Sequence, residues 1–182
     1  MGTPRPPDPA NLVIGVITSD PALLSQVRNA LELKFGRIND QSEPVPFDFT
    51  DYYKTEMGKP LVRQWFSFAP LCSPDRLAGI KLATNELENT WRRPDRTRRV
   101  NLDPGFLTLH NLVLATTKNY AHRIYLGKGI FAEVTLLYKD GRFQALDWTY
   151  PDYRSAFAVE FLIRVRAGYV AKLATLRGTA GN

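Results

Sequence analysis

Cysteine and histidine are scarce in this chain, which excludes two kinds of site. Of 182 residues, one is a cysteine, Cys72, and two are histidines, His110 and His122. One cysteine cannot form an intramolecular disulfide, and a structural zinc site needs several cysteine or histidine ligands at close spacing. The two histidines also lack the H-x-x-x-H spacing of a helical metal site. These absences predict a protein of a reducing compartment, and we expect it to be cytoplasmic.

Long apolar runs and familiar nucleotide-binding motifs are also missing. The longest apolar run, Leu12–Ile17, is far shorter than the roughly 20 residues of a membrane span. No apolar core of a secretory signal follows Arg5. There is no G-x-x-x-x-G-K-[ST] loop and no G-x-S-x-G elbow, and Gly127-Lys128-Gly129 is too short for a dinucleotide fingerprint. We expect neither membrane association nor binding of nucleotides through a P-loop.

The composition that remains is that of a folded protein with a basic excess. Apolar residues make up 44% and charged residues 23% of the chain, and a chain of this length can bury a substantial core. The net charge of +6 favours phosphate-bearing partners. Five arginines lie between residues 92 and 99. They form either an anion-binding segment or a solvated turn after a helix.

Hydrophobic periodicity predicts six elements in the first 102 residues, in the order β-α-β-β-α-β. The expected strands are 12–17, 45–49, 62–68 and 98–102, and the expected helices begin at Pro21 and Pro74, each after an N-capping residue. This is the split βαβ order of a ferredoxin-like sandwich, which several α+β folds share.

The second half of the chain predicts an elaboration of that core. We expect a short helix at 107–117, strands at 122–126, 130–138 and 142–146, and a last helix over 151–173. Asp140-Gly141 predicts a type I′ hairpin turn. The prediction is thus one α+β domain over residues 11–176, a ferredoxin-like core with a C-terminal β-hairpin and helix. A flexible leader of residues 1–10 and a flexible tail of residues 177–182 flank it.

Polar side chains cluster at two places in the predicted core. Residues 47–53 combine carboxylates with phenols, among them Asp48 and Tyr52, which could bind a cation and stack on a ligand. Alternatively they form a capped turn that covers the core. Residues 98–105 carry Arg98 and Arg99, whose planar forks suit phosphate. Strand alternation places Asn101 and Asp103 with Arg99, although Asp103-Pro104-Gly105 also predicts an ordinary turn.

Two further clusters lie in the elaboration. Lys118, His122 and Arg123 offer donors to an anion, and His122 could act as a general acid or base. Glu133, on a predicted strand, could join them in catalysis or simply pair with Arg123. Residues 148–153 contain three aromatic rings and Asp152. We expect the rings either to stack on a ligand or to pack on the core, and Asp152 to stabilise the start of the last helix.

These clusters favour a cleft for a phosphorylated or otherwise anionic small molecule, such as a nucleotide. The expected catalytic residues are His122, Glu133 and Asp103. The expected ligand-binding residues are Asp48, Tyr52, Arg98, Arg99, Asn101, Lys118 and Arg123. A divalent cation organised by the carboxylates is a candidate cofactor. The alternatives are an RNA-binding module that uses the arginines and aromatic rings, and a non-enzymatic protein-interaction subunit.

Five segments of the chain have a recognisable pattern. They are PFDFTDYY at Pro46–Tyr53, EMG at Glu56–Gly58, KLATNELE at Lys81–Glu88, RRVNLDPGFLTLHNLVLATTKNYAHRIYLGKGIFAEVTL at Arg98–Leu136 and WTYPDY at Trp148–Tyr153. In these segments the chain resembles the bacterial family known as domain of unknown function 4416, and the resemblance runs from Val13 to about Tyr169. Members of that family are sometimes labelled GTP-binding proteins. The resemblance implies a bacterial protein and carries over no catalytic residue.

Overall fold

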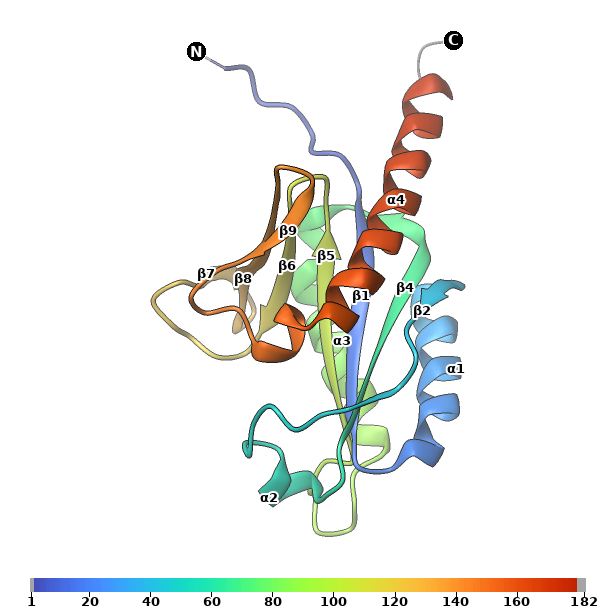
Figure 1. The fold of residues 1–182 in the computed structure, drawn as a ribbon, viewed down its shortest axis with the longest axis vertical. Helices are drawn as coiled ribbons and strands as arrows, with labels where there is room; N and C mark the ends of the chain where they lie inside the picture. Colours follow the sequence, from blue (N-terminus) through green and yellow to red (C-terminus); the bar gives the residue numbers. More distant parts are fainter. Residues whose placement is uncertain (1, 180–182) are drawn as a thin grey trace.

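The structure is a computed structural model that describes residues 2–179, and its centre is a nine-stranded antiparallel sheet with helices on both faces (Figure 1). The strands are β1 (Ala10–Thr18), β2 (Ile38–Gln41), β3 (Val45–Pro46), β4 (Val62–Cys72), β5 (Val100–Leu107), β6 (Asn111–Thr116), β7 (Ile124–Gly127), β8 (Ile130–Lys139) and β9 (Arg142–Ala145). The helices are α1 (Leu24–Phe35), α2 (Lys54–Met57), α3 (Leu77–Thr90) and α4 (Ala156–Thr179), and short 3-10 turns cover Pro21–Leu23, Pro74–Arg76 and Pro151–Arg154. The predicted mixed α and β class is confirmed.

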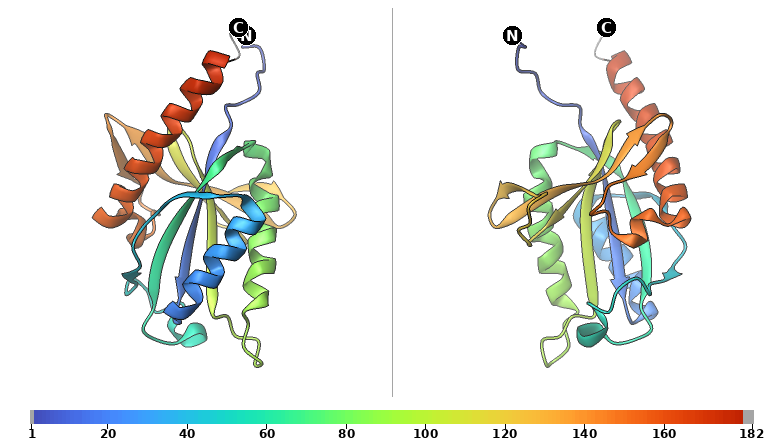
Figure 2. Two further views of the ribbon diagram at one scale, coloured as in Figure 1. Left: turned by 90° about the vertical axis from the view of Figure 1, so that its right-hand side faces the viewer. Right: turned by 60° about the vertical axis from the view of Figure 1, so that its left-hand side comes forward.

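Strand β1 lies at the centre because its side chains are apolar on both faces. All nine of its residues are buried. Leu12 and Ile14 pack in the core beneath α1 and α3, whereas Val13 packs in the core beneath α4. The two views of Figure 2 show α1 and α3 on one side of the sheet and α4 crossing the other. The continuous apolar run that predicted a buried strand is explained by this cover on both faces.

The sheet is larger than the predicted core. Its strand order is β2-β4-β1-β5-β6-β8-β7, with β3 on β4 and β9 on β8. The strand predicted at 45–49 is reduced to the two residues of β3, and Ile38–Gln41, which the sequence analysis did not assign, pairs with β4 instead. Only Ile38 of that segment is buried. Such a short and mostly polar strand leaves little periodicity to detect.

The helix predicted at 107–117 is wrong, because this segment forms the end of β5, a turn and β6. Leu112 and Leu114 are both buried beneath α4 with a spacing of two, and the backbone N–H of Thr108 donates to the carbonyl of Asn111 over 2.9 Å. A short apolar run fits a helix and a strand equally well, and tertiary pairing decides between them.

The turn predicted at Asp103-Pro104-Gly105 is also wrong, because these residues continue β5. Pro104 pairs with Ile14 of β1, whereas the pairing of β5 with β6 begins only at Gly105, opposite Leu114. A Cβ on Gly105 would lie 2.5 Å from Cδ2 of Leu114, so the strands meet closely there. The proline therefore occupies a stretch with no strand on the β6 side, where its missing N–H is tolerated.

The C-terminal half matches the predicted hairpins and extends the last helix. Asp140 and Gly141 have φ angles of 52° and 76°, as a type I′ turn requires, and they join β8 to β9. Helix α4 begins at Ala156 and runs to Thr179, so the predicted tail is helical over 177–179 and otherwise lies outside the described residues. At the other end of the chain, the Tyr169 hydroxyl donates to the carbonyl of Pro9 over 2.9 Å and ties the predicted leader to α4.

Candidate functional site

A polar cavity of about 400 Å³ opens where β5 lacks a neighbouring strand. Its walls come from β5, α3, the end of β6, β8 and the loop before α2. β6 pairs with β5 only from Gly105 onward. The part of β5 before Gly105 therefore has no strand beside it on this side, and side chains fill the space. The cavity is thus a consequence of the interrupted strand pairing.

Six of the ten predicted site residues meet at this cavity. The lining includes Tyr52, Arg98, Asn101, Asp103, Lys118 and Glu133. The other four, which do not line it, are Asp48, Arg99, His122 and Arg123. Asp48 is exposed on the loop after β3. Arg99 lies at a separate surface hollow, where its NH2 group is 2.5 Å from Oδ2 of Asp20.

Helix α3 supplies a polar wall that the sequence analysis missed. Lys81, Asn85 and Glu88 of α3 line the cavity, and so does Arg92, which follows the end of the helix. The spacing of four and three residues places the three helical side chains on one face, next to the apolar face that the periodicity did predict. The detectable signal was a second, polar stripe on a helix whose other face is buried.

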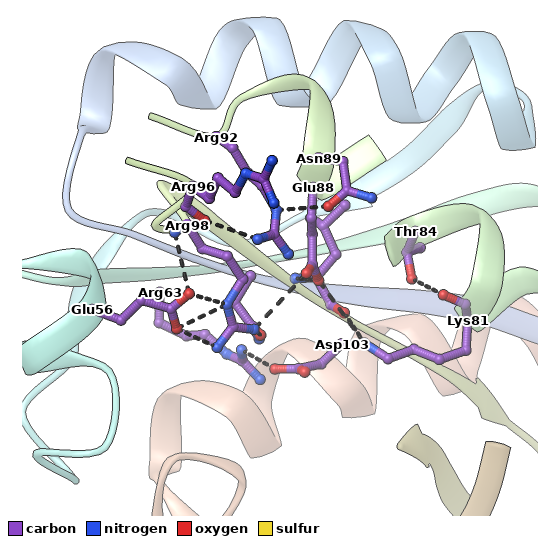
Figure 3. Close-up of polar contacts among 12 residues, drawn as sticks. Glu56, Arg63, Lys81, Thr84, Glu88, Asn89, Arg92, Arg96, Arg98 and Asp103 are labelled. Atoms are coloured by element: carbon purple, nitrogen blue, oxygen red, sulfur yellow. Dashed lines mark hydrogen bonds and ion pairs between the residues drawn. The ribbon is translucent and has the colours of Figure 1, made fainter. Parts of the chain in front are cut away.

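Two of these side chains replace the missing strand beside β5. The Lys81 ammonium donates to the carbonyl of Leu102 over 2.7 Å, and the N–H of Leu102 donates to Oε1 of Glu88 over 2.7 Å. The Lys81 Nζ also lies 3.9 Å from the same carboxylate oxygen, so the two side chains form a pair at the strand edge (Figure 3). An unpaired backbone edge inside a protein is costly, and this pair satisfies it.

Burial raises the pKa of Glu88 above its ordinary value, although Lys81 and the Leu102 N–H oppose the rise. A raised pKa in the folded state means that folding binds a proton, so ionisation of Glu88 costs stability as the pH rises from about 4, the ordinary range of glutamate. Glu88→Gln keeps an acceptor for Leu102 and removes this titration. We expect the free energy of unfolding of Glu88→Gln, minus that of the wild type, to increase with pH through the acidic range.

Urea denaturation at a series of pH values measures this difference. Glu86→Gln is the matched control, since it removes an exposed carboxyl of the same helix. Its difference from the wild type should change little over the same range. A Glu88→Gln difference that is flat, or that falls with rising pH, would contradict the assignment.

The floor of the cavity is fixed by an arginine in the protein interior. The side chain of Arg63 is 1% exposed, and its NH1 donates to Oδ2 of Asp103 over 2.9 Å while NH2 lies 3.1 Å from Oδ2 of Asp152. Its guanidinium lies 5.1 Å from the ring centres of both Trp65 and Tyr153. Asp152, just before the last helix, therefore pairs with Arg63 of β4.

Arg63 also sets the charge state of Asp103. Burial alone would raise the pKa of Asp103, but Arg63 and then Lys81 outweigh burial and hold it below the ordinary value. Gly15, opposite on β1, makes room for this pair, because a Cβ there would lie 2.6 Å from NH2 of Arg63. Asp103 is consequently a carboxylate at neutral pH, and the hydrogen bond from Arg63 to Oδ2 fixes the orientation of its side chain.

The arginine fork expected to bind phosphate is occupied in the structure. Arg98 donates from Nε to Oε1 of Glu56 over 2.9 Å and from NH2 to Oε2 over 2.7 Å (Figure 3). Its remaining nitrogen, NH1, donates to Oδ1 of Asn101 over 2.9 Å. Arg98 therefore anchors the α2 segment to β5 and orients the Asn101 amide.

Asn101 carries a buried donor without a partner. The residue is 4% exposed, its oxygen is used by Arg98, and its Nδ2 makes no hydrogen bond in residues 2–179. The other buried side-chain atoms that lack partners in this part of the chain belong to Arg63, Trp65 and Tyr153, which do not line the cavity. Buried polar groups are rarely left unpaired.

Two cations at the cavity have no carboxylate partner among the described residues. The Lys118 ammonium lies 3.8 Å from the centre of the Tyr52 ring. Arg92 donates only to neutral oxygens, namely Oδ1 of Asn89 over 2.7 Å and the carbonyl of Arg96 over 2.8 Å. Lys118 and Arg92 are both exposed. They leave positive charge uncompensated at the cavity.

Glu133 reaches the cavity from β8 with its charge already paired. Its Oε2 accepts from Nε of Arg123 over 2.7 Å and lies 3.3 Å from Nε2 of His122. Arg123 also donates from NH2 to the Tyr150 hydroxyl over 2.8 Å, and the His122 ring stacks on Trp148 at 4.8 Å. The expected pairing of Glu133 with Arg123 is confirmed. His122 does not line the cavity, and in the described part of the chain its link to the lining is Glu133.

Comparison with known proteins places the chain in a family. The family model described as Domain of unknown function (DUF4416) matches residues 8–169, which include every residue of the cavity. The chain belongs to this family. No curated protein and no solved structure matches it.

In this DUF4416 protein, the carboxylates that were candidates for a cation site do not gather around one point. Residues 2–179 contain no group of three or more histidine, cysteine, aspartate or glutamate side chains placed to hold a metal ion. The carboxylates of Asp103 and Glu133 each pair with an arginine instead. None of the helices described is long and apolar enough to cross a bilayer.

Proposed function

We propose that the cavity beside β5 binds a small phosphorylated, or otherwise anionic, metabolite. Its volume of about 400 Å³ falls within the range of small-molecule sites, which span roughly 300–1,000 Å³. The residues around it come from six separated segments of the chain, the last of which contributes Tyr150. A nucleotide is one member of this class of ligand.

The observation that carries the proposal is the unpaired amide of Asn101. Leaving a buried donor unsatisfied costs about 1–3 kcal/mol, and a ligand oxygen at this position would recover that free energy. The amide cannot simply rotate, because its oxygen is held by Arg98. The donor therefore has a fixed direction, as a preorganised binding site requires.

The charges of the cavity support an anionic ligand. Asp103 shares Arg63 with Asp152, Glu133 pairs with Arg123, and Glu88 lies 3.9 Å from Lys81. Lys118 and Arg92 are the lining cations that pair with no carboxylate in residues 2–179. An ammonium and a guanidinium without acidic partners attract phosphate, and the net charge of +6 would raise the local concentration of anions.

If the ligand is chemically processed, the two carboxylates at the cavity are the groups we assign to acid or base chemistry. Asp103 and Glu133 lie at the wall, and His122 is 3.3 Å from Glu133. In this proposal His122 orients Glu133 and does not itself touch the ligand.

We also propose that the first half of the chain is a ferredoxin-like split βαβ core to which the later strands were added. The element order β1-α1-β2-β4-α3-β5 and the strand order β2-β4-β1-β5, antiparallel throughout, support this relation. On this view the cavity marks the junction between the core and the added strands.

Thermal denaturation against a panel of nucleotides, sugar phosphates and dicarboxylates tests the proposed function. A ligand that binds only the folded state adds about 2.7 kcal/mol of stability at one hundred times its dissociation constant. We expect at least one anionic compound to raise the melting temperature of the wild type. We expect the increase to shrink in Lys118→Ala and to persist in the matched control Lys139→Ala, which removes an exposed lysine outside the cavity.

Two results would count against this function. One is a panel in which no anionic compound shifts the melting temperature. The other is an equal loss of the shift in Lys118→Ala and Lys139→Ala, which would indicate nonspecific charge attraction. An RNA oligonucleotide belongs in the same panel, because binding with a steep dependence on salt would point to a nucleic-acid partner instead.

A further inference from the structure

Asn101 and Asp103 present a matched donor and acceptor to the cavity. They are two residues apart on β5, so their side chains lie on the same face of the sheet, and both line the cavity. One side-chain oxygen of each residue accepts a hydrogen bond from an arginine. Arg98 donates to Oδ1 of Asn101, and the buried Arg63 donates to Oδ2 of Asp103.

The atoms that remain are one donor and one acceptor. Within residues 2–179, Nδ2 of Asn101 makes no hydrogen bond, and the ion pair and hydrogen bond of Asp103 with Arg63 both use Oδ2. The Asp103 side chain is 26% exposed and lines the cavity, and Oδ1 is the oxygen that Arg63 does not hold. The Asn101 amide lies close enough to the Asp103 carboxylate to help lower its pKa through a weak side-chain contact, but no acceptor in residues 2–179 lies in hydrogen-bonding geometry with Nδ2.

A hydroxyl group is the chemical partner that fits such a pair. It accepts one hydrogen bond and donates one, so it would satisfy the amide and the carboxylate together. A phosphate oxygen would satisfy the amide but would be repelled by the carboxylate. An ammonium group would satisfy the carboxylate and leave the amide unpaired.

We propose that Asn101 and Asp103 bind a hydroxyl group of the ligand, and that the cavity takes a phosphorylated polyol, such as a sugar phosphate. This inference rests on the proposed function. The phosphate binds the lining cations Lys118 and Arg92, which have no carboxylate partner in residues 2–179, and the carbon skeleton carries the hydroxyl to Asn101 and Asp103. Tyr52 and Tyr150, which are 57% and 40% exposed, also line the cavity, and in this proposal their rings pack against the carbon skeleton.

Four probes of graded chemistry test this assignment by titration calorimetry. They are ribose 5-phosphate, ethyl phosphate, inorganic phosphate and free ribose. We expect ribose 5-phosphate to bind the wild type at least about tenfold more tightly than ethyl phosphate, since only the former completes the donor and acceptor pair. Asn101→Ala and Asp103→Asn should lower the affinity for ribose 5-phosphate by about tenfold and leave that for ethyl phosphate within about twofold.

The two variants protect the test against misfolding. Asp103→Asn keeps an oxygen for Arg63, whereas Asn101→Ala keeps the Asp103 carboxylate and its bond to Arg63, so the two variants disturb different contacts. Lys118→Ala should weaken ribose 5-phosphate and ethyl phosphate alike. Lys139→Ala should weaken neither.

The outcomes separate the hydroxyl site from the anion site. Equal affinity for ribose 5-phosphate and ethyl phosphate, unaffected by either β5 variant, would overturn the hydroxyl assignment and leave the anion site standing. Binding of free ribose as tightly as its phosphate would keep the hydroxyl pair and overturn the anion site. Binding of none of the four probes would overturn both.

Discussion

Replacement of Arg63 by methionine should lower the free energy of unfolding by about 3–5 kcal/mol, because it leaves two inward-facing carboxylates without their shared cation. Arg63 binds Asp103 and Asp152 at 2.9 and 3.1 Å, and its guanidinium lies against two aromatic rings. Methionine fills much of the same volume and isolates the loss of charge from the creation of a void.

The matched control is Arg99→Met, which breaks an arginine–aspartate pair at the surface. Arg99 and Asp20 are 34% and 35% exposed, and pairs of this kind contribute about 0–1 kcal/mol. Chemical denaturation of the wild type and the two variants gives the comparison. If Arg63→Met and Arg99→Met cost the same, the network around Arg63 is not what supports the floor of the cavity.

Gly105→Ala should destabilise the protein by about 1–3 kcal/mol, the range expected when a well-packed interior must accept an additional methyl group. The added Cβ would lie 2.5 Å from Cδ2 of Leu114 and 2.6 Å from the backbone carbonyl oxygen of Val113. The leucine can change its rotamer, but the carbonyl can move only if β5 and β6 separate. This is the point at which the pairing of the two strands begins.

Gly168→Ala is the control, since nothing lies within 4 Å of its added Cβ. It lies within α4, where alanine is favoured over glycine by about 1 kcal/mol. We therefore expect thermal unfolding to show a lower melting temperature for Gly105→Ala and an equal or higher one for Gly168→Ala. A Gly105→Ala protein as stable as the wild type would mean that the strand junction is more compliant than its spacing indicates.

These two substitutions act on the structural cause of the cavity. Strand β5 leaves its β6 side unpaired as far as Pro104, and α3 satisfies that edge with Lys81 and Glu88 rather than with another strand. The gap that results is lined by polar side chains, and the buried Arg63 holds one of them, Asp103, in place. A change that closes or widens the junction should consequently alter ligand binding as well as stability.

Local chemistry in the sequence determined several features of the fold. The apolar run of β1, the proline after the N-capping Asp20 in the 3-10 turn that leads into α1, and the Asp140-Gly141 turn each specify their element through a few adjacent residues. The clustering of Arg98, Asn101 and Asp103 near Lys118 and Glu133 in one cavity also followed from reading polar residues at strand ends. The sequence did not show which of those side chains remain available to a ligand.

Pairing between distant residues decided the rest. Residues 111–116 form a strand because β8 pairs with them, and Asp103-Pro104-Gly105 stays extended because β1 does. Arg98 and Arg99 are engaged by Glu56 and Asp20, which are 42 and 79 residues away along the chain. The sequence specifies which groups are charged, but the free energy of a charge depends on its neighbours and its burial, and only the tertiary structure supplies both.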